Sequence, residues 1–485
     1  MLRNCIIIVL FGILLTAFGE IQQGDHTRYV TSTFDTTQQP YRLFVPDIIK
    51  HGNPLPLLVV LHGKGVDYNA WLDYTPVKEY AQKYGYIVAA PHGRGDYFYR
   101  GAGEQDVLDI IHCVKKELPV NDNRIYLMGH SMGGWGTCWI GLRHPDMFAA
   151  ICPMSGFAPM QLLPNALHLA PFIIHSEDDP IVPVSNSRIP AQKLAELGIS
   201  FQYREEHGYG HKSKMIGDNF DRLFQWLNLH PRVSQPKHIR FVTRTPAHGK
   251  AYWLIILETT IYPRYAEINA IVDDENMVTI QTDNINQFAI SLVDIPRQKD
   301  KSLRVKIDEY IHPTTENTPF AVFTRDFNSQ RWKIEYMTPE QLPTWKSQVL
   351  YTIPRDNEII TSTSLLASAA SKIVCEQTGA DLCLFLDDMF QFPGGDLTED
   401  DALDLYVYPD ERLAIISYAG GPLPEHLMMQ AHLYPAGKYD PRLRRVWSVA
   451  VPMILAEKMN GNMQTLPEPI SAYMLQGLRT KPLVK

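Results

Sequence analysis

The sequence predicts an α/β protein whose first half is a parallel sheet covered by helices on both faces. Two observations predict this fold class. Between about residues 41 and 230, short runs rich in Val, Ile, Leu and Phe alternate with longer segments of mixed polarity. Several of these runs also end in Gly, His, Ser or Asp, residues typical of the carboxyl ends of parallel strands, where ligands and reactive side chains gather.

The expected strands are short apolar runs separated by stretches long enough for a helix. They are residues 56–61, 86–90, 124–128, 148–154, 171–174 and 201–204. Residues 215–229 predict a closing helix, because Phe220, Leu223 and Leu227 recur at helical spacing. Together these elements predict one α/β domain over residues 20–230.

The N-terminus has the pattern of a signal peptide. Arg3 is followed by an apolar run over residues 5–18, and polar sequence begins at Glu20. The small residues Ala17 and Gly19 place the expected cleavage after Gly19. An uncleaved anchor is the alternative, but the run is shorter than the roughly 20 residues of a membrane span. We therefore expect a secreted or periplasmic protein with no membrane span once residues 1–19 are removed.

The predicted secondary structure changes after a Pro-containing linker at residues 231–236. Strand-like runs then follow one another without intervening helices, at residues 239–243, 252–257, 265–271, 277–281, 288–293, 303–307 and 320–324. This pattern predicts a small all-β module, residues 236–337, which we call the β module. A second Pro-containing stretch at 339–354 leads into a C-terminal mixed α/β module, residues 355–485, with a helix expected at 364–377.

Composition and charge exclude several classes of protein. A length of 485 residues predicts two to four domains, and 45% hydrophobic with 20% charged residues is typical of globular proteins. The net charge is −8 and the sequence has no basic run, so we expect no nucleic-acid partner. Five cysteines follow Cys5 without a CxxC pair or a Cys/His spacing typical of zinc sites. We therefore expect no disulfide framework, no metal and no cofactor.

The motif that carries the chemistry is Gly129-His130-Ser131-Met132-Gly133. It follows an expected strand and precedes a segment of small residues suited to a helix. Glycines two positions before and after a serine leave room for a tight, strained strand-to-helix turn. A helix start beside the serine also supplies N–H groups and the positive end of a helix dipole. Ser131 is therefore the expected nucleophile.

A serine hydroxyl needs a base to remove its proton and a carboxylate to orient that base. Asp178 and Asp179 follow one expected strand, and His207 and His211 follow the next. We favour Asp179, which directly precedes a proline, over Asp178. We favour His211, which follows two glycines, over His207. The chain order nucleophile, acid, base is that of α/β-hydrolases, so the fold class predicted for the first domain is the α/β-hydrolase fold.

The oxyanion of an acyl-transfer reaction needs preorganised N–H donors. One expected donor is the backbone N–H of Met132. The second is expected from the loop after residues 57–61, with the amide of Lys64 as the best candidate. A simple strand-terminating turn at His62-Gly63 is the alternative interpretation of this loop.

Four side chains are candidates for the substrate pocket. His62 and His130 adjoin the expected oxyanion loop and nucleophile. Tyr97 and Tyr99 follow the strand that ends at Ala90 and could line an acyl or sugar pocket.

Several motifs together resemble one group of esterases. These are Leu61-His62-Gly63, Ala90-Pro91-His92-Gly93, Gly129-His130-Ser131-Met132-Gly133-Gly134 and Asp179-Pro180-Ile181-Val182-Pro183. They resemble the polyhydroxybutyrate depolymerase, feruloyl esterase and acetyl xylan esterase group, and prolyl oligopeptidase-like esterases share much of the pattern. The resemblance covers about residues 50–230 and implies the fold and the triad, but not the ester. Ser176 departs from it, since the group usually has glycine at this position.

The last segment carries a weaker resemblance. Its motifs are Ser364-Leu365-Leu366, Gly379-Ala380-Asp381-Leu382, Gly395-Asp396-Leu397-Thr398 and the run 414–418 before Gly420-Gly421. They resemble the C-terminal domain of 5′-nucleotidases, which implies a nucleoside-holding shell. The metal-binding domain of those enzymes has no counterpart here, so the resemblance implies no phosphatase activity.

The sequence as a whole predicts a secreted serine esterase that cleaves carboxylic esters through an acyl-enzyme. The expected partner is a small-molecule or polysaccharide ester, with acetyl or feruloyl groups as candidates. One alternative is a peptidase resembling prolyl oligopeptidases, although no propeller domain precedes the hydrolase. Another is a scaffold that holds a carbohydrate or nucleoside beside a vestigial hydrolase.

Overall fold

The structure is a computed structural model that describes residues 22–353 and six later strands. Within 22–353 it leaves out residues 52, 157, 263, 299, 309, 315–317, 327, 328, 330 and 345–348. The signal peptide expected at 1–19 and the helix expected at 364–377 lie outside the described residues.

An eight-stranded sheet forms the N-terminal unit, residues 22–230, in the order β1-β2-β4-β3-β5-β6-β7-β8. The parallel strands are β3 (Leu55–Leu61), β4 (Ile87–Pro91), β5 (Val120–His130), β6 (Ala150–Met154), β7 (Phe172–Ser176) and β8 (Gln202–Glu206). Each overlaps an expected strand. The fold class predicted for this part of the chain is therefore the one observed, with nucleophile, acid and base candidates at the ends of β5, β7 and β8.

Two antiparallel strands at one sheet edge were not expected. β1 (Gly24–Thr31) pairs with β2 (Gln38–Val45), and β2 pairs antiparallel with β4. β1 has the sequence GDHTRYVT, and among its residues only Val30 is buried. An edge strand with one neighbour needs little apolar sequence, so a search for Val/Ile/Leu-rich runs passes over it.

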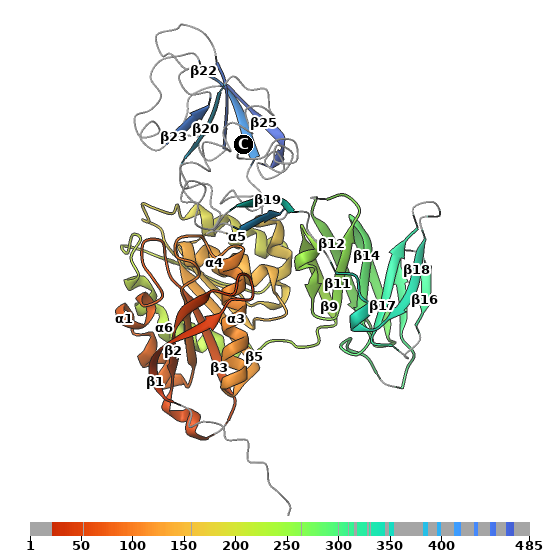
Figure 1. Ribbon diagram of the computed structural model, residues 1–485, viewed down its shortest axis with the longest axis horizontal. Helices are drawn as coiled ribbons and strands as arrows, with labels where there is room; N and C mark the ends of the chain where they lie inside the picture. Colours follow the sequence, from red (N-terminus) through yellow and green to blue (C-terminus); the bar gives the residue numbers. More distant parts are fainter. Residues whose placement is uncertain are drawn as a thin grey trace, which may run out of the picture.

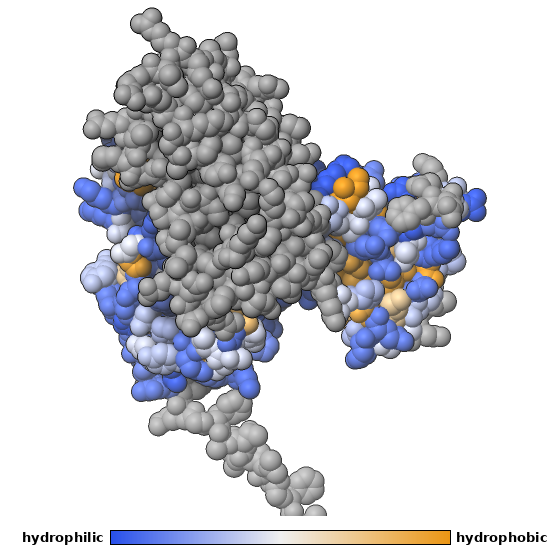
Figure 2. Space-filling view, turned by 45° about the horizontal axis from the view of Figure 1, so that its top comes forward, coloured by the Kyte–Doolittle hydropathy of each residue, from blue (hydrophilic) through white to orange (hydrophobic). Residues whose placement is uncertain are grey.

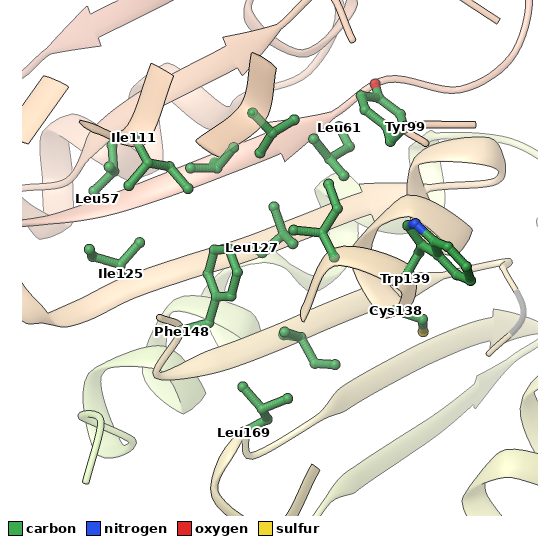
Figure 3. Close-up of a cluster of buried hydrophobic side chains, with 14 of the residues drawn as sticks. Leu57, Leu61, Tyr99, Ile111, Ile125, Leu127, Cys138, Trp139, Phe148 and Leu169 are labelled. Atoms are coloured by element: carbon green, nitrogen blue, oxygen red, sulfur yellow. The ribbon is translucent and has the colours of Figure 1, made fainter. Parts of the chain in front are cut away.

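Helices cover both faces of the sheet (Figure 1). One face carries α3 (Ala102–Glu117), α4 (Met132–Arg143), the 3-10 helix η2 (Met160–His168) and α5 (Ser185–Glu196). The other carries α1 (Ala70–Tyr74), α2 (Val77–Tyr84) and α6 (Lys214–Leu229), and a short 3-10 helix, η1 (Asp47–His51), follows β2. Each face of the sheet has its own buried core, because successive side chains of a strand point to opposite faces. In β3, Leu57 and Leu61 belong to the first core, under α3 and α4, and Leu58 belongs to the second core, under α2 and α6. Figure 3 shows the first core, where Leu57, Leu61 and Leu127 from the strands lie with Ile111 and Trp139 from the helices.

Two five-stranded sheets form the β module. One has the order β10-β11-β14-β17-β18 and the other β16-β15-β13-β12-β9. Their bounds are β9 (His238–Thr243), β10 (Lys250–Ala251), β11 (Leu254–Thr259), β12 (Ala266–Val272), β13 (Met277–Asp283), β14 (Ile285–Ser291), β15 (Arg304–Ile307), β16 (Tyr310–Pro313), β17 (Phe320–Arg325) and β18 (Trp332–Met337). Residues of both sheets share one buried cluster, which includes Ile268 and Phe288. Strands β16 and β18 lie at the outer edges, carry many exposed residues and were not expected from the sequence.

The β module contacts the N-terminal unit through β9 and the 3-10 helix η2. Asn165 of η2 is buried, and its side-chain amide donates to the carbonyls of Leu142 and Val242, while its Oδ1 accepts from the Val242 amide. Tyr252 donates to the carbonyl of Pro145 across the same junction. Figure 1 shows β9 and β12 on the side of the β module nearest to the N-terminal unit.

The remaining strands belong to the C-terminal part of the chain. After the 3-10 helix η4 (Pro339–Gln341), β19 (Val349–Ile353) pairs with β21 (Gly395–Thr398). A five-stranded sheet has the order β23-β20-β24-β22-β25, with bounds β20 (Leu382–Leu386), β22 (Arg412–Tyr418), β23 (Ala431–Tyr434), β24 (Trp447–Pro452) and β25 (Asn462–Pro469). The stretch 339–354, expected as a connection, thus contains a strand.

The surface of the described residues is mainly hydrophilic on the face seen in Figure 2, with apolar residues at separate places on the β module. Among the helices of the described residues, none has the length and apolar character to cross a lipid bilayer.

Candidate active site

Ser131 occupies the turn between β5 and α4. Its backbone has φ 58° and ψ −118°, a conformation that non-glycine residues seldom adopt and that costs conformational energy. The Ser131 amide donates to the carbonyl of Met154 at 2.9 Å, which ties the turn to the neighbouring strand β6. The tight strand–serine–helix turn expected from the motif is therefore present.

The glycines around Ser131 permit this turn because backbone passes where a side chain would otherwise stand. A Cβ on Gly129 would lie 2.2 Å from the carbonyl oxygen of Gly133, and one on Gly133 would lie 2.1 Å from that of Leu61. Real Cβ atoms do not approach backbone so closely. The motif spacing thus reflects a steric requirement of the turn.

Ser131, His211 and Asp179 form one hydrogen-bonded chain. Nε2 of His211 lies 2.8 Å from Oγ of Ser131, and Nδ1 lies 2.7 Å from Oδ2 of Asp179. The second carboxylate oxygen of Asp179 accepts from the amides of Ile181 and Val182, both at 2.9 Å. Each imidazole nitrogen of His211 therefore has a defined partner, as a general base oriented by an acid requires.

The environment of Asp179 keeps it ionised. Burial alone would raise the pKa of this carboxyl, but hydrogen bonds from His211, Val182 and Ile181 hold the pKa below its usual value. A second buried imidazole, His175, lies with Nε2 3.4 Å from Oδ2 of Asp179 and also contacts the carbonyl of Val182. The sequence interpretation did not single out His175, although its place at the end of β7 was visible.

The alternatives Asp178 and His207 lie elsewhere in the same loops. Oδ1 of Asp178 accepts from the amides of Gly208 and Gly210 at 3.1 and 3.2 Å, so Asp178 fastens the loop that carries His211. His207 is exposed and pairs with Glu177. Among the residues that the structure describes, neither side chain takes part in the hydrogen-bonded chain of Ser131, His211 and Asp179.

Ser176, the residue where the esterase pattern usually has glycine, takes part in this loop network. Its hydroxyl donates to Oδ1 of Asp178 at 2.5 Å and accepts from the amide of Tyr209 at 3.3 Å. The departure from the pattern therefore adds a link between the acid loop and the histidine loop.

His130 lies directly against the imidazole of His211. Its ring centroid is 4.7 Å from that of His211, with the planes tilted by 37°. Burial, reinforced by the neighbouring His211, lowers the pKa of His130 to about 3, so its imidazole is neutral at ordinary pH. The prediction that His130 lies at the pocket agrees with its position, but its contact with His211 could not be read from the sequence.

Two of the other pocket candidates are placed differently than expected. Tyr99 is fully buried, donates from its hydroxyl to the carbonyl of His62, and belongs to the core shown in Figure 3. The expectation that Tyr99 lines the pocket is therefore wrong, because its ring packs into the space left by Gly93 and Gly136, where a Cβ would lie 2.2 and 2.6 Å from ring carbons. Tyr97 is half-buried and is absent from the residues that line the cavity beside Ser131.

His62 lines that cavity, but it is buried, and its ring nitrogens contact the carbonyls of Gly63 and His92.

A cavity of about 270 Å³ opens beside Ser131. Its lining combines the reactive groups with a mainly apolar wall: His62, Gly63, Lys64, Val66, Ala70, Trp71, Tyr74, Thr75, His130, Ser131, His211, Ser213 and Ile216. Lys64, expected to supply an oxyanion donor, lies on this wall, and Met132, the other expected donor, begins α4 directly after Ser131. The volume is just below the range of about 300–1,000 Å³ typical of small-molecule sites, which suits a small acyl group.

The family model described as "Prolyl oligopeptidase family" matches residues 73–170, which is less than half of the chain. This segment contains Ser131 but ends before Asp179 and His211.

Curated proteins with similar sequences include two that are named as esterases. The chain is 35% identical over 105 residues to the bifunctional acetylxylan esterase/xylanase XynS20E of Neocallimastix patriciarum, covering 21% of this chain and 16% of that protein. It is 32% identical over 129 residues to feruloyl esterase B of Thermothelomyces thermophilus, covering 24% and 43%. The chain therefore spans less than half the length of each of these relatives.

Solved structures with a similar fold match about two fifths of the chain. A thermostable esterase is 26% identical, with a TM-score of 0.38, and the overlap covers 43% of this chain and 63% of that one. The α/β-hydrolase fold of the N-terminal unit rests on its own strand order and on its strained serine turn.

Proposed function

We propose that the protein is a serine hydrolase that cleaves carboxylic esters, with Ser131 as nucleophile, His211 as base and Asp179 as the acid that orients it. The observation that carries the proposal is the geometry of His211, which lies 2.8 Å from the hydroxyl of Ser131 and 2.7 Å from the carboxylate of Asp179. The similarity to proteins named as acetylxylan and feruloyl esterases supports the reaction class.

In the proposed mechanism, Oγ of Ser131 attacks the ester carbonyl while Nε2 of His211 takes its proton. The N–H groups of Met132 and Lys64 stabilise the oxyanion of the tetrahedral intermediate. Collapse expels the alcohol, which receives the proton from His211, and leaves an acyl group on Ser131. Water activated by His211 then attacks the acyl-enzyme and releases the acid.

The cavity supports a small acyl or aryl group as the substrate feature that is recognised. Val66, Trp71, Tyr74 and Ile216 give one wall apolar and aromatic character. Tyr74 is 80% exposed, so it can contact a substrate that extends beyond the cavity. Acetyl or feruloyl esters of a polysaccharide fit these features, and the signal-peptide pattern at residues 1–19 supports export to such a substrate.

The organisation proposed for the chain is a catalytic domain at 20–230, the β module at 236–337 and a module at 355–485 resembling the C-terminal domain of 5′-nucleotidases. The linker composition at 231–236 and the change from α/β to strand-only sequence support the first boundary.

Replacing the nucleophile tests the proposal directly. We expect Ser131→Ala to abolish hydrolysis of p-nitrophenyl acetate while circular dichroism and thermal unfolding stay close to wild type. Turnover retained in the purified variant would refute the assignment. A panel of acetylated, feruloylated and long-chain esters then distinguishes the acyl groups.

A second candidate activity is peptide hydrolysis, which the match to the prolyl oligopeptidase family favours. The same triad would cleave an amide by the same acyl-enzyme route. Cleavage of proline-containing peptides at a kcat/KM above that for p-nitrophenyl acetate would favour the peptidase, and absence of peptide cleavage would favour the esterase.

A further inference from the structure

Three potential metal ligands meet where the β module contacts the N-terminal unit. Nε2 of His144 lies 2.7 Å from Oε1 of Glu104, and Nδ1 of His248 lies 3.8 Å from the same oxygen. One ligand atom from each of the three residues falls within 4.8 Å of the others. The two imidazole rings meet edge to face at 5.6 Å between centroids.

The three side chains come from separate, well-defined elements. Glu104 lies in the first turn of α3, and its side chain is 4% exposed. His144 is the C-terminal cap of α4. His248 ends η3 (Pro246–His248) of the β module, a 3-10 helix whose first turn is capped by the Thr245 side chain. The cluster therefore joins two modules through side chains held by ordered backbone.

We infer that Glu104, His144 and His248 form a binding site for a divalent transition-metal cation, with Zn²⁺ as the best-suited ion. Two imidazoles and one carboxylate are ligands that Zn²⁺ accepts, at bond lengths of about 2.0–2.2 Å. Ligand atoms at those lengths in a tetrahedron stand about 3.3 Å apart. The distances from Oε1 of Glu104 to the two histidines, 2.7 and 3.8 Å, bracket this value, and all three ligand atoms lie within 4.8 Å of one another. Side-chain movements of up to about 1.5 Å would therefore bring them to the distances that Zn²⁺ requires.

A hydrogen bond orients the carboxylate of Glu104, as is usual for carboxylates that bind metals. The indole N–H of Trp139 donates to Oε2 at 3.0 Å, which fixes the carboxylate and leaves Oε1 toward the histidines. Arg143 competes for Oε1, since its Nε lies 3.3 Å away. Its guanidinium also stacks 4.3 Å above the Trp139 ring, a contact that retains Arg143 when a metal takes its place at Oε1.

A cavity of about 390 Å³ provides access and room for further ligands. His144 and His248 both line it. A water from this cavity can complete a four-coordinate site. The cation would link the β module to α3 and α4, so its binding would stabilise the contact between the two modules.

Metal titration of the full-length chain tests the inference. After removal of metals with a chelator, isothermal titration with ZnCl₂ should give one site per chain. CoCl₂ should give visible absorption bands typical of tetrahedral nitrogen and oxygen ligands. One equivalent of Zn²⁺ should raise the thermal unfolding midpoint by several degrees and leave p-nitrophenyl acetate turnover within twofold.

Matched histidine variants separate this site from other histidines. His248→Ala and His144→Ala should each weaken Zn²⁺ binding at least tenfold and remove the thermal shift. His112→Ala, which alters an exposed histidine on the same cavity, should leave both unchanged. Esterase turnover and circular dichroism verify folding, and if His144→Ala fails to fold, His248→Ala decides alone. Absence of a Zn²⁺ site in the folded wild type, or wild-type affinity in folded His248→Ala, would overturn the inference.

Discussion

At the scale of single residues, the proposed mechanism depends on which of two neighbouring aspartates contacts His211. Asp179 contacts His211, whereas the adjacent Asp178 accepts backbone N–H groups of Gly208 and Gly210. The sequence favoured Asp179 because it precedes a proline. It could not reveal the task of Asp178, which depends on how two loops from different strands approach each other.

These two carboxylates should respond differently to the same change. Asp179→Asn keeps the shape but loses the charge that orients and stabilises the imidazolium, so we expect kcat to fall by about 10³–10⁴. Asp178→Asn retains an oxygen that accepts from Gly208 and Gly210, and we expect kcat within a few-fold of wild type. Steady-state kinetics with p-nitrophenyl acetate measures both, and equal losses would contradict the assignment.

The buried His130 predicts a specific dependence of stability on pH. Its pKa is about 3 in the folded protein, against about 6.5 in the unfolded chain. Between these values the unfolded state binds more protons, so the free energy of unfolding falls as pH falls from about 6.5 toward 3. The contribution of His130 is at most about 1.4 kcal/mol per pH unit.

Urea denaturation of wild type and His130→Gln across pH 4–7 measures this contribution. The difference between the two proteins isolates His130 from the carboxylates that titrate in the same range. The variant should lose stability less steeply on acidification, and parallel curves would show that His130 does not titrate as stated.

At the scale of elements, the predictable features are those with a local cause. The apolar runs of β3 to β7 and the helical spacing in α6 follow from burial on regular faces, so the sequence predicted them. The edge strands β1, β16 and β18 were missed because an edge strand is half-solvated and needs few apolar residues. The burial of Tyr99 was missed because its ring fills space left by Gly93 and Gly136, two glycines that lie in separate segments of the sequence.

The serine turn predicts a strong effect of a single methyl group. Gly133→Ala places a Cβ 2.1 Å from the carbonyl oxygen of Leu61, so backbone must move and the turn at Ser131 is lost. We expect loss of activity and destabilisation of more than about 2 kcal/mol, measured by urea unfolding.

Gly217→Ala is the matched control for this substitution. Gly217 lies inside α6, and its new Cβ would meet Pro76 at 3.4 Å, an ordinary contact. We expect it to stabilise the protein by about 0.5–1 kcal/mol, since alanine favours a helix interior over glycine. Comparable destabilisation of both variants would contradict the steric explanation.

At the scale of the whole molecule, the contact between the β module and the N-terminal unit could not be predicted from the sequence. Asn165 and Val242 are 77 positions apart, and η2 has neither a strand nor a regular helix pattern. The Glu104, His144 and His248 cluster was hidden for the same reason, since its members come from three distant segments. The sequence therefore predicted many strands on each side of this junction but not the contacts across it.

The junction predicts that Asn165 stabilises both units together. Asn165→Ala leaves the carbonyl of Leu142 and both backbone polar groups of Val242 without their buried partner. We expect a loss of about 2 kcal/mol or more in the free energy of unfolding, with faster proteolysis near the linker at 231–236. Unchanged unfolding and proteolysis would mean that water replaces the amide at no cost.

The central claim is that Ser131 is an activated nucleophile, and covalent labelling tests it most directly. Treatment with a fluorophosphonate, followed by intact-protein and peptide mass spectrometry, should show one adduct per chain, located on Ser131. Labelling should disappear in Ser131→Ala and slow markedly in His211→Ala, because the serine then lacks its base. A folded wild-type protein that takes up no label, or carries it on another residue, would contradict the account.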